Sequence, residues 1–322
     1  MGLQKMAALV LLALLAAGCG SAATSGPNVA AISSAPGASK SPAASGNSAS
    51  QSSPSTPATA GRHKSSSPGP TATTPATAVS QPVPSRSPPG TPRCSTSAAQ
   101  GECGPYSDAS ITGTTTNTSV GNDVWNPISG WVQTLHVTGP SDWSVTAKMP
   151  AGNTAVVSYP SLGAWFDTDT GSPTPLTDYS SITSSFSEDM NATTATSAWA
   201  AYDIWLGPDG GTKAGDEVMI QTDFANQGRC TYEATATFGG QRWGLCQYGS
   251  ELIWQLTNGG TGTRNESAGS IVILPMLTWL QAHGHLPQNL GLSLIGYGWE
   301  ICSTGGRSET FRLSNFSLTA TR

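Results

Sequence analysis

The first 101 residues contain no aspartate or glutamate, and the first 124 contain no tryptophan. All 19 Asp and Glu and all 10 Trp of the 322-residue chain therefore lie at or after Glu102. From Glu102 onward, eight Lys and Arg stand against those 19 acidic residues, a formal charge of −11, whereas the six Lys and Arg before it give +6. Nucleic acid favours a basic surface. We therefore expect no nucleic-acid partner for the acidic part.

The N-terminus carries the pattern of an export signal. Lys5 precedes the apolar run "MAALVLLALLAAG", which is too short to span a membrane as a mature helix, and Cys19 follows. The stretch "LAAG" before Cys19 resembles the lipobox of bacterial lipoproteins, with Ala16 where Leu is usual. That resemblance implies cleavage before Cys19 and acylation of its sulfur; an ordinary cleaved signal with an incidental cysteine is the alternative. In either case residues 1–18 are a signal peptide, and the protein is exported, lipid-anchored at the cell surface or secreted.

Residues 19–93 lack the apolar side chains that a folded domain needs. Stretches such as "SSPSTPATAGRHKSSSPGPTATTPATA" consist almost wholly of Ser, Thr, Pro, Ala and Gly. Such a segment cannot bury enough apolar surface to offset its conformational entropy. We expect a disordered linker between the signal and a domain at 94–322.

The five cysteines after Cys19 suit an exported protein, in which disulfides persist. The pairs Cys94/Cys103 and Cys230/Cys246 are favoured, although spacing alone does not prove connectivity. Cys302 is then free, or it displaces one partner of the second pair.

Metal and cofactor signatures are missing. No Cys-x-x-Cys or Cys/His spacing typical of zinc occurs, and "AHGHL" at 282–286 fits a helix end better than a metal site. No Gly-x-Ser-x-Gly motif supports a serine hydrolase. We expect neither cofactor nor metal, and a monomer.

From about Tyr106 the chain alternates short strand-like runs with turns. The runs are rich in Val, Ile, Thr and aromatics, and Gly, Pro, Asn and Asp separate them, as in "WVQTLHVTG", "DWSVTAKMP", "AYDIWLG" and "TFRLSNFSLTA". "TATFGGQRW" predicts a hairpin. One segment, "SIVILPMLTWLQAHGHLP" at 270–287, has helical spacing and helix-stop residues at its end. The pattern predicts an all-β antiparallel sandwich, a jelly roll, with one docked α-helix.

Strand alternation then raises the question of what one face of "AGDEVMIQTD" contacts. Side chains alternate faces along a strand. One face receives three residues that suit a core, and the other receives Glu217, Met219, Gln221 and Asp223. Asp223 is expected at the surface.

Two further strands offer a carboxylate in the same way. In "AYDIWLG", Asp203 and Trp205 share a face, and in "GYGWEIC", Glu300 shares a face with two glycines and Cys302. If these faces coincide, Glu217 and Glu300 flank a cleft floored by Trp205, with Asp203 beside Glu217. Two carboxylates with separated pKa values suit glycosidic bond cleavage, because one attacks while the other donates a proton. In the retaining mechanism the two lie about 5–5.5 Å apart.

At these residues the chain resembles glycoside hydrolase family 12, the jelly-roll endoglucanases and xyloglucanases. The resemblance covers about 120–322 and rests on an ordered series: "GNDVWNP", "QTLHV", "DWSVTAKMP", "VVSYPS", "AYDIWL", "DEVMI", "LPMLTWLQAHGHL", "GYGWE" and "TFRLSNFSLTA". It implies that Glu217 is the nucleophile, Glu300 the general acid/base and Asp203 the hydrogen-bond partner of the nucleophile. It also implies that Met219 lies beneath the sugar at the cleavage site.

The resemblance further implies sugar contacts for Trp125, with Asn122 before it and Trp205 on the cleft floor. Core packing is the alternative for Trp125, Trp205 and Trp165. Two departures stand out. Gln221 replaces a tryptophan of the usual "EIMIWL", and Asn122-Asp123 replaces an Asn-Asn pair.

These residues suggest two functions. The first is a retaining endo-β-1,4-glucanase acting on cellulose, xyloglucan or mixed-linkage glucan. The second is a non-catalytic, lectin-like carbohydrate-binding module on the same fold, since one fold hosts many functions. Retention of both glutamates favours the enzyme.

Overall fold

The structure is a computed structural model that describes residues 92–113, 118–166, 173–207, 217–227, 230–257 and 263–322. The predicted signal peptide, Cys19 and all but the end of the predicted linker lie outside these residues. Within the described residues no helix is both long and apolar enough to cross a membrane.

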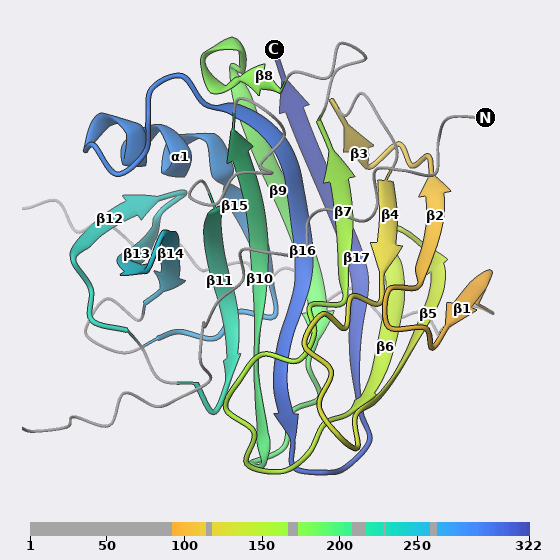
Figure 1. Cartoon of the computed structure of the whole chain (residues 1–322). Coiled ribbons are helices and arrows are strands. Elements are labelled where there is room, and N and C mark those ends of the chain that lie inside the picture. The colour runs from red at the N-terminus through yellow and green to blue at the C-terminus, as the bar shows by residue number, and fades with distance from the viewer. Residues whose placement is uncertain (1–91, 114–117, 167–172, 208–216, 228–229, 258–262) are drawn as a thin grey trace, which may run out of the picture. The chain divides into compact units, whose positions relative to one another are not determined.

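Two β-sheets pack face to face (Figure 1). The seven-stranded sheet has the order β1 (Cys94–Thr96), β5 (Val132–Gly139), β6 (Asp142–Lys148), β17 (Glu309–Thr321), β9 (Ser181–Asp189) and β15 (Ala268–Val272), with β3 (Ile111–Thr112) beside β17. The ten-stranded sheet has the order β12 (Ala234–Phe238), β13 (Gln241–Tyr248), β14 (Glu251–Leu256), β11 (Glu217–Ala225), β10 (Thr196–Gly207), β16 (Gly291–Thr304), β7 (Ser161–Trp165), β4 (Thr118–Gly121) and β2 (Glu102–Tyr106), with β8 (Thr174–Pro175) beside β16. The predicted all-β sandwich is confirmed.

Most neighbouring strands are antiparallel, and β11 and β14 are a parallel exception. The predicted hairpin joins β12 to β13 through Gly239 and Gly240, whose φ values of 57° and 79° suit glycine. The parallel pair has no local sequence signal, because β12 and β13 intervene between its strands.

The predicted helix is observed as α1 (Ile273–Ala282), which begins directly after β15 and ends before His283 and Gly284, as the stop signals predict. It packs at the edge of the core beneath β14, where the Trp254 and Trp279 rings lie 5.2 Å apart. Figure 1 shows the helix beside this end of the ten-stranded sheet. The helix thus covers apolar surface of β14.

Both favoured disulfides are present. Cys94–Cys103 joins β1 to β2, which belong to different sheets, and Cys230–Cys246 holds the segment before β12 against β13. The structure records no free cysteine among the described residues, so the expectation of a free Cys302 thiol is not met.

A β-bulge changes the predicted faces of β11. The β10–β11 register shifts by one residue between Ala200 and Ala201, so Thr222 becomes an extra residue on β11. Asp223 consequently turns toward the core, where its buried carboxyl lies within hydrogen-bonding reach of Glu188 on β9. The predictions that Asp223 shares a face with Glu217 and lies at the surface are therefore wrong.

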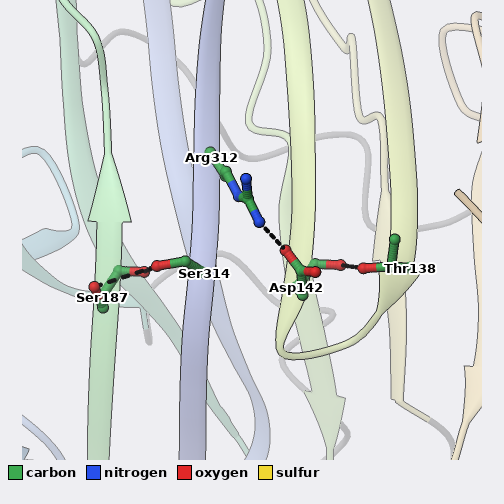
Figure 2. A network of polar contacts seen from close by, with 5 residues as sticks. All are labelled: Thr138, Asp142, Ser187, Arg312 and Ser314. Carbon is green, nitrogen blue, oxygen red and sulfur yellow. Dashed lines mark hydrogen bonds and ion pairs between the residues drawn. The ribbon is translucent and has the colours of Figure 1, made fainter. Parts of the chain in front are cut away.

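The seven-stranded sheet carries polar contacts on the side away from the core (Figure 2). Arg312 of β17 pairs with Asp142 of β6 at 3.0 Å, and Thr138 donates to the Asp142 carbonyl. On the other side of β17, Ser314 donates to the Ser187 carbonyl at 3.1 Å. These contacts link neighbouring strands on a face that holds no part of the candidate site.

Candidate active site

The ten-stranded sheet has an apolar cluster on its outer face, the face away from the other sheet. This cluster is separate from the core and contains Val156, Trp199, Ala201, Met219, Phe224, Cys246, Ile253 and Cys302. A soluble sheet normally presents polar side chains on such a face. Part of the outer face of this sheet is therefore packed with buried apolar side chains and is not exposed to solvent.

Four adjoining strands each place one carboxylate on this outer face. They are Glu251 on β14, Glu217 on β11, Asp203 on β10 and Glu300 on β16. Their positions are set by register: Glu217 lies opposite Trp205, and Asp203 lies opposite Met219. No register shift falls between Trp199 and Trp205 in the β10–β16 pair, so alternation holds over this stretch. The three carboxylate-bearing faces therefore coincide, which is the condition that the sequence left open.

The four carboxylates are buried although they stand outside the core. Their exposed fractions are 7% for Asp203 and Glu217, 8% for Glu251 and 2% for Glu300. The segment between β6 and β7 contributes to this cover, since Val156 belongs to the outer cluster and Tyr159 donates its hydroxyl to the Ala201 carbonyl of β10 at 3.0 Å.

Gly298 makes this cover possible. A Cβ at Gly298 would lie 2.0 Å from the Pro160 carbonyl oxygen, which no real side chain tolerates. The Trp299 amide donates to the same carbonyl at 3.2 Å. The absence of a side chain at Gly298 thus lets the covering segment dock directly beside Glu300.

Burial dominates the electrostatics of the site. It raises the pKa of Asp203 to about 7 and that of Glu251 to about 8. Burial, followed by repulsion from neighbouring carboxylates, also raises the pKa values of Glu217 and Glu300. Four carboxylates packed in this way do not all ionise near neutral pH. The site therefore holds protons that an exposed carboxylate would release.

Asp203 is the best-connected member of the group. One of its oxygens accepts a hydrogen bond from the Trp205 indole at 2.9 Å, and its carboxyl lies within hydrogen-bonding reach of Glu217. Two facing carboxyl groups can bond only if one of them carries a proton. The bond between them lowers the pKa of Asp203 and raises that of Glu217, so in the resting site the shared proton lies on Glu217.

A small cavity of about 80 Å³ opens between these residues and the loops. Asp203, Trp205 and Glu300 line it together with Asp123 and Tyr159. The pKa of Asp123 is raised to about 6, mainly by burial. A partly enclosed space bounded by carboxyls and aromatic rings can hold one face of a polar, ring-shaped ligand.

The other residues predicted to bind sugar are placed unequally. Trp125 is partly buried and packs against the outer cluster, and the indole N–H is without a partner. Met219 lies within that cluster. Asn122 is fully buried: its amide donates to the Ala98 carbonyl and accepts from Gln133, so its side chain serves the loop and does not line the cavity. The sugar contacts of Trp125 and Met219 stay predictions.

The structure also places Trp165, for which core packing is the alternative to a sugar contact, and Gln221, which departs from the family motif. Trp165 is half-buried at the end of β7, directly opposite Leu294 in the row that also contains Trp205. Gln221 is buried, donates to the Met219 sulfur at 3.2 Å and accepts from Gln255 at 2.8 Å. Gln221, which stands where family 12 usually has a tryptophan, therefore joins a network of side chains on the outer face beside the site.

Sequence reasoning gave no site role to three residues that the structure places there, although it noted Asp123 as a departure from the family pattern. Glu251 comes directly after a turn, and only the parallel pairing of β14 with β11 brings it to Glu217. Asp123, with a φ of 33°, and Tyr159 lie outside the strands, where alternation predicts nothing. In the described part of the chain, no group of three or more His, Cys, Asp or Glu is arranged to hold a metal ion.

No protein-family model matches the chain, and no curated protein matches it in sequence. Solved structures do match it. A native family 12 xyloglucanase from Bacillus licheniformis has a TM-score of 0.57 and 22% identity, covering 70% of this chain and 100% of its own. The fold is that of the family 12 glycoside hydrolases.

Two further structures agree. The xyloglucanase domain of NopAA, a type three effector from Sinorhizobium fredii, in complex with cellobiose, has a TM-score of 0.55 and 24% identity, covering 71% of this chain and 100% of its own. An endoglucanase from Rhodothermus marinus has a TM-score of 0.56 and 18% identity, covering 71% of this chain and 99% of its own. At these identities the likeness shows the fold alone.

Proposed function

We propose that the protein is a retaining, endo-acting glycoside hydrolase that cuts β-1,4-linked glucan. One observation carries the proposal: Asp203, Glu217 and Glu300, from three adjoining strands, share one buried outer face of the sheet. Buried carboxylates without cationic partners destabilise a fold. Cleavage of a glycosidic bond by acid–base catalysis requires two carboxyl groups in one site, one ionised and the other protonated.

The roles are those that the resemblance to family 12 implies. Ionised Glu217 attacks the anomeric carbon while Glu300 donates its proton to the departing oxygen, and the glycosidic C–O bond breaks. Glu300, now a carboxylate, then takes a proton from water, whose oxygen attacks the anomeric carbon and releases Glu217. When Glu217 ionises, the proton that the two carboxyls share passes to Asp203, which the Trp205 indole holds in place and which then donates a hydrogen bond to the Glu217 carboxylate.

The substrate class rests on the aromatic surface and on the fold. Trp205 and Tyr159 line the cavity beside the acids, and indole and phenol rings offer apolar faces to sugar C–H groups. Structures of this fold include xyloglucanases and an endoglucanase, and one of them holds cellobiose. We therefore place cellulose, xyloglucan and mixed-linkage glucan in the substrate class.

The test compares the wild type with Glu217→Gln and Glu300→Gln. Reducing ends released from carboxymethyl-cellulose, barley β-glucan and xyloglucan are measured, and melting temperatures show whether each variant is folded. We expect turnover by the wild type on at least one glucan and its loss in both folded variants. Glu233→Gln, a change in the segment before β12, serves as the control and keeps full activity.

Glucan binding without turnover by the wild type on all three substrates would contradict the enzyme and support the lectin-like module. Affinity electrophoresis in gels containing each glucan makes that distinction. Neither binding nor turnover would contradict both functions for these substrates.

We also propose that the protein acts outside the cell, anchored through Cys19. The support is the sequence alone: a signal-like segment, a lipobox-like "LAAG" and a linker without acidic residues. Expression in a bacterial host with labelled palmitate tests this, because Cys19→Ala should abolish the label and leave the protein outside the membrane fraction. A label that persists in Cys19→Ala would contradict it.

A further inference from the structure

Tyr248 is exposed on the same sheet as the candidate site. Among the described residues only two large hydrophobic side chains are strongly exposed, Tyr248 at 55% and Val132 at 56%. Val132 begins β5 in the other sheet. Tyr248 ends β13, and its position two residues after Cys246, a member of the outer cluster, places it on the outer face.

Register connects Tyr248 to the nucleophile position. Tyr248 is the direct partner of Glu251 across the two-residue turn between β13 and β14. Val218 and Leu252 are partners in the parallel β11–β14 pair, so Glu217 and Glu251, each one residue earlier, are neighbours. Tyr248 therefore stands two strand spacings, about 10 Å, from Glu217 along a line that crosses the strands.

The same line continues past the catalytic candidates. Glu217 is opposite Trp205, Trp205 is opposite Leu294, and Leu294 is opposite Trp165. One row across six strands thus combines carboxylates with large apolar side chains. A row perpendicular to the strands has the shape that an extended polysaccharide needs, because each strand adds one side chain along the ligand.

Glu251, which lies between Tyr248 and Glu217 in this row, has a carboxyl oxygen without a hydrogen-bond partner. It is 8% exposed, and one of its oxygens is buried without a hydrogen-bond partner. Buried polar groups in native proteins nearly always have a partner, so this oxygen of Glu251, on the register partner of Tyr248, is open to a hydroxyl of a bound ligand. Carboxyl groups accept from, and when protonated donate to, sugar hydroxyls.

We propose that Tyr248 and Glu251 form an additional sugar subsite at the β13–β14 turn, next to Glu217. The Tyr248 ring packs against one pyranose of the glucan chain, and Glu251 bonds a hydroxyl of the sugar between Tyr248 and the reacting centre. The inference rests on the proposed function, since it extends the same glucan along the same face.

The experiment measures kcat/KM on cello-oligosaccharides of three to six units. In the wild type, kcat/KM rises when the chain becomes long enough to reach the subsite. Tyr248→Ala should remove that rise, lowering kcat/KM on the longest substrate roughly two- to tenfold and leaving the shortest unchanged. Tyr248→Phe keeps the ring and should keep the rise, and Val132→Ala should match the wild type.

Glu251 is tested by the ratio of kcat/KM on the longest substrate to kcat/KM on the shortest. This ratio cancels any effect of the substitution on the chemical step. Glu251→Leu should lower the ratio, whereas Glu251→Gln, which still accepts and donates hydrogen bonds, should preserve most of it. Equal ratios in the wild type, Tyr248→Ala and Glu251→Leu would overturn the subsite while leaving the hydrolase standing.

Failure of the hydrolase itself is distinguishable. If the wild type releases no products, calorimetric binding of cellotriose and cellohexaose replaces kcat/KM in the same ratio. A lower ratio in Tyr248→Ala then still supports the subsite. An unchanged ratio, or no binding of either sugar by the wild type, overturns it.

Discussion

Glu217 and Glu251 are side-by-side neighbours on two parallel strands, β11 and β14, with their carboxyls on one buried face. Repulsion between them, added to burial, is part of what raises the pKa of Glu217. The sequence separates the two residues by a hairpin, so their proximity is a product of topology.

This relationship predicts a pH dependence of stability. Unfolded Asp and Glu titrate near 4, whereas burial raises the pKa of Asp203 to about 7 and of Glu251 to about 8. Between these limits the folded protein binds more protons than the unfolded chain, so the free energy of unfolding falls as pH rises. Melting temperatures should decline from about pH 5 to about pH 8.

Glu251→Gln should flatten that decline, because one of the groups that must ionise in a buried site is gone. Glu233→Gln, outside the site, should decline in parallel with the wild type. A melting temperature that rises over this range, or a Glu251→Gln variant with the full slope, would show that the carboxyls are not held protonated by the fold.

Gly298 should tolerate no side chain. Its Cβ would lie 2.0 Å from the Pro160 carbonyl oxygen, so Gly298→Ala must displace the covering segment next to Glu300. We expect a loss of about 1–3 kcal/mol in the free energy of unfolding, read from denaturant titration, and a loss of glucan turnover. Gly163→Ala, whose Cβ would meet nothing closer than 3.4 Å, should leave stability nearly unchanged. Similar stability of the two variants would refute this account of the loop.

The Cys94–Cys103 disulfide should stabilise the sandwich, because it ties edge strands of the two sheets together. Replacing both cysteines by serine should cost about 2–4 kcal/mol of unfolding free energy. Glucan turnover at a temperature well below the transition should persist, since both residues lie away from the cavity. Abolished turnover in the folded variant would mean that the N-terminal strands shape the site.

The Arg312–Asp142 ion pair of Figure 2 should contribute little to stability and nothing to glucan turnover. It is partly exposed and lies on the sheet opposite the site, and such pairs contribute about 0.2–1 kcal/mol. Arg312→Ala should shift stability within that range, by less at high salt, and leave turnover unchanged. A loss of activity would show coupling between the two sheets that the static structure does not contain.

Strand alternation predicted on which face of its own strand each of Asp203, Glu217 and Glu300 lies, because β10 and β16 run in regular register between Trp199 and Trp205. It left open whether the three faces coincide, which the pairing of the strands decides. It failed at Asp223 because a bulge reverses the alternation there, and bulges have no pattern in a single sequence. The place of Glu251 in the site could not be predicted from the sequence for a different reason. Its neighbour Glu217 is set by the pairing of β14 with β11, two strands that are distant in the sequence. Tyr159 and Asp123 come from loops, whose paths depend on packing rather than on periodicity.

The central claim, that Glu217 is a nucleophile, is tested most directly by trapping. A 2-deoxy-2-fluoro cellobioside with a good leaving group slows the second step of a retaining enzyme, so the glycosyl-enzyme accumulates. Mass spectrometry of the proteolysed protein should find one added disaccharide on the peptide containing Glu217, and none in Glu217→Gln. A label on another residue, or no label on a protein that hydrolyses the same glycoside without the fluorine, would contradict the account.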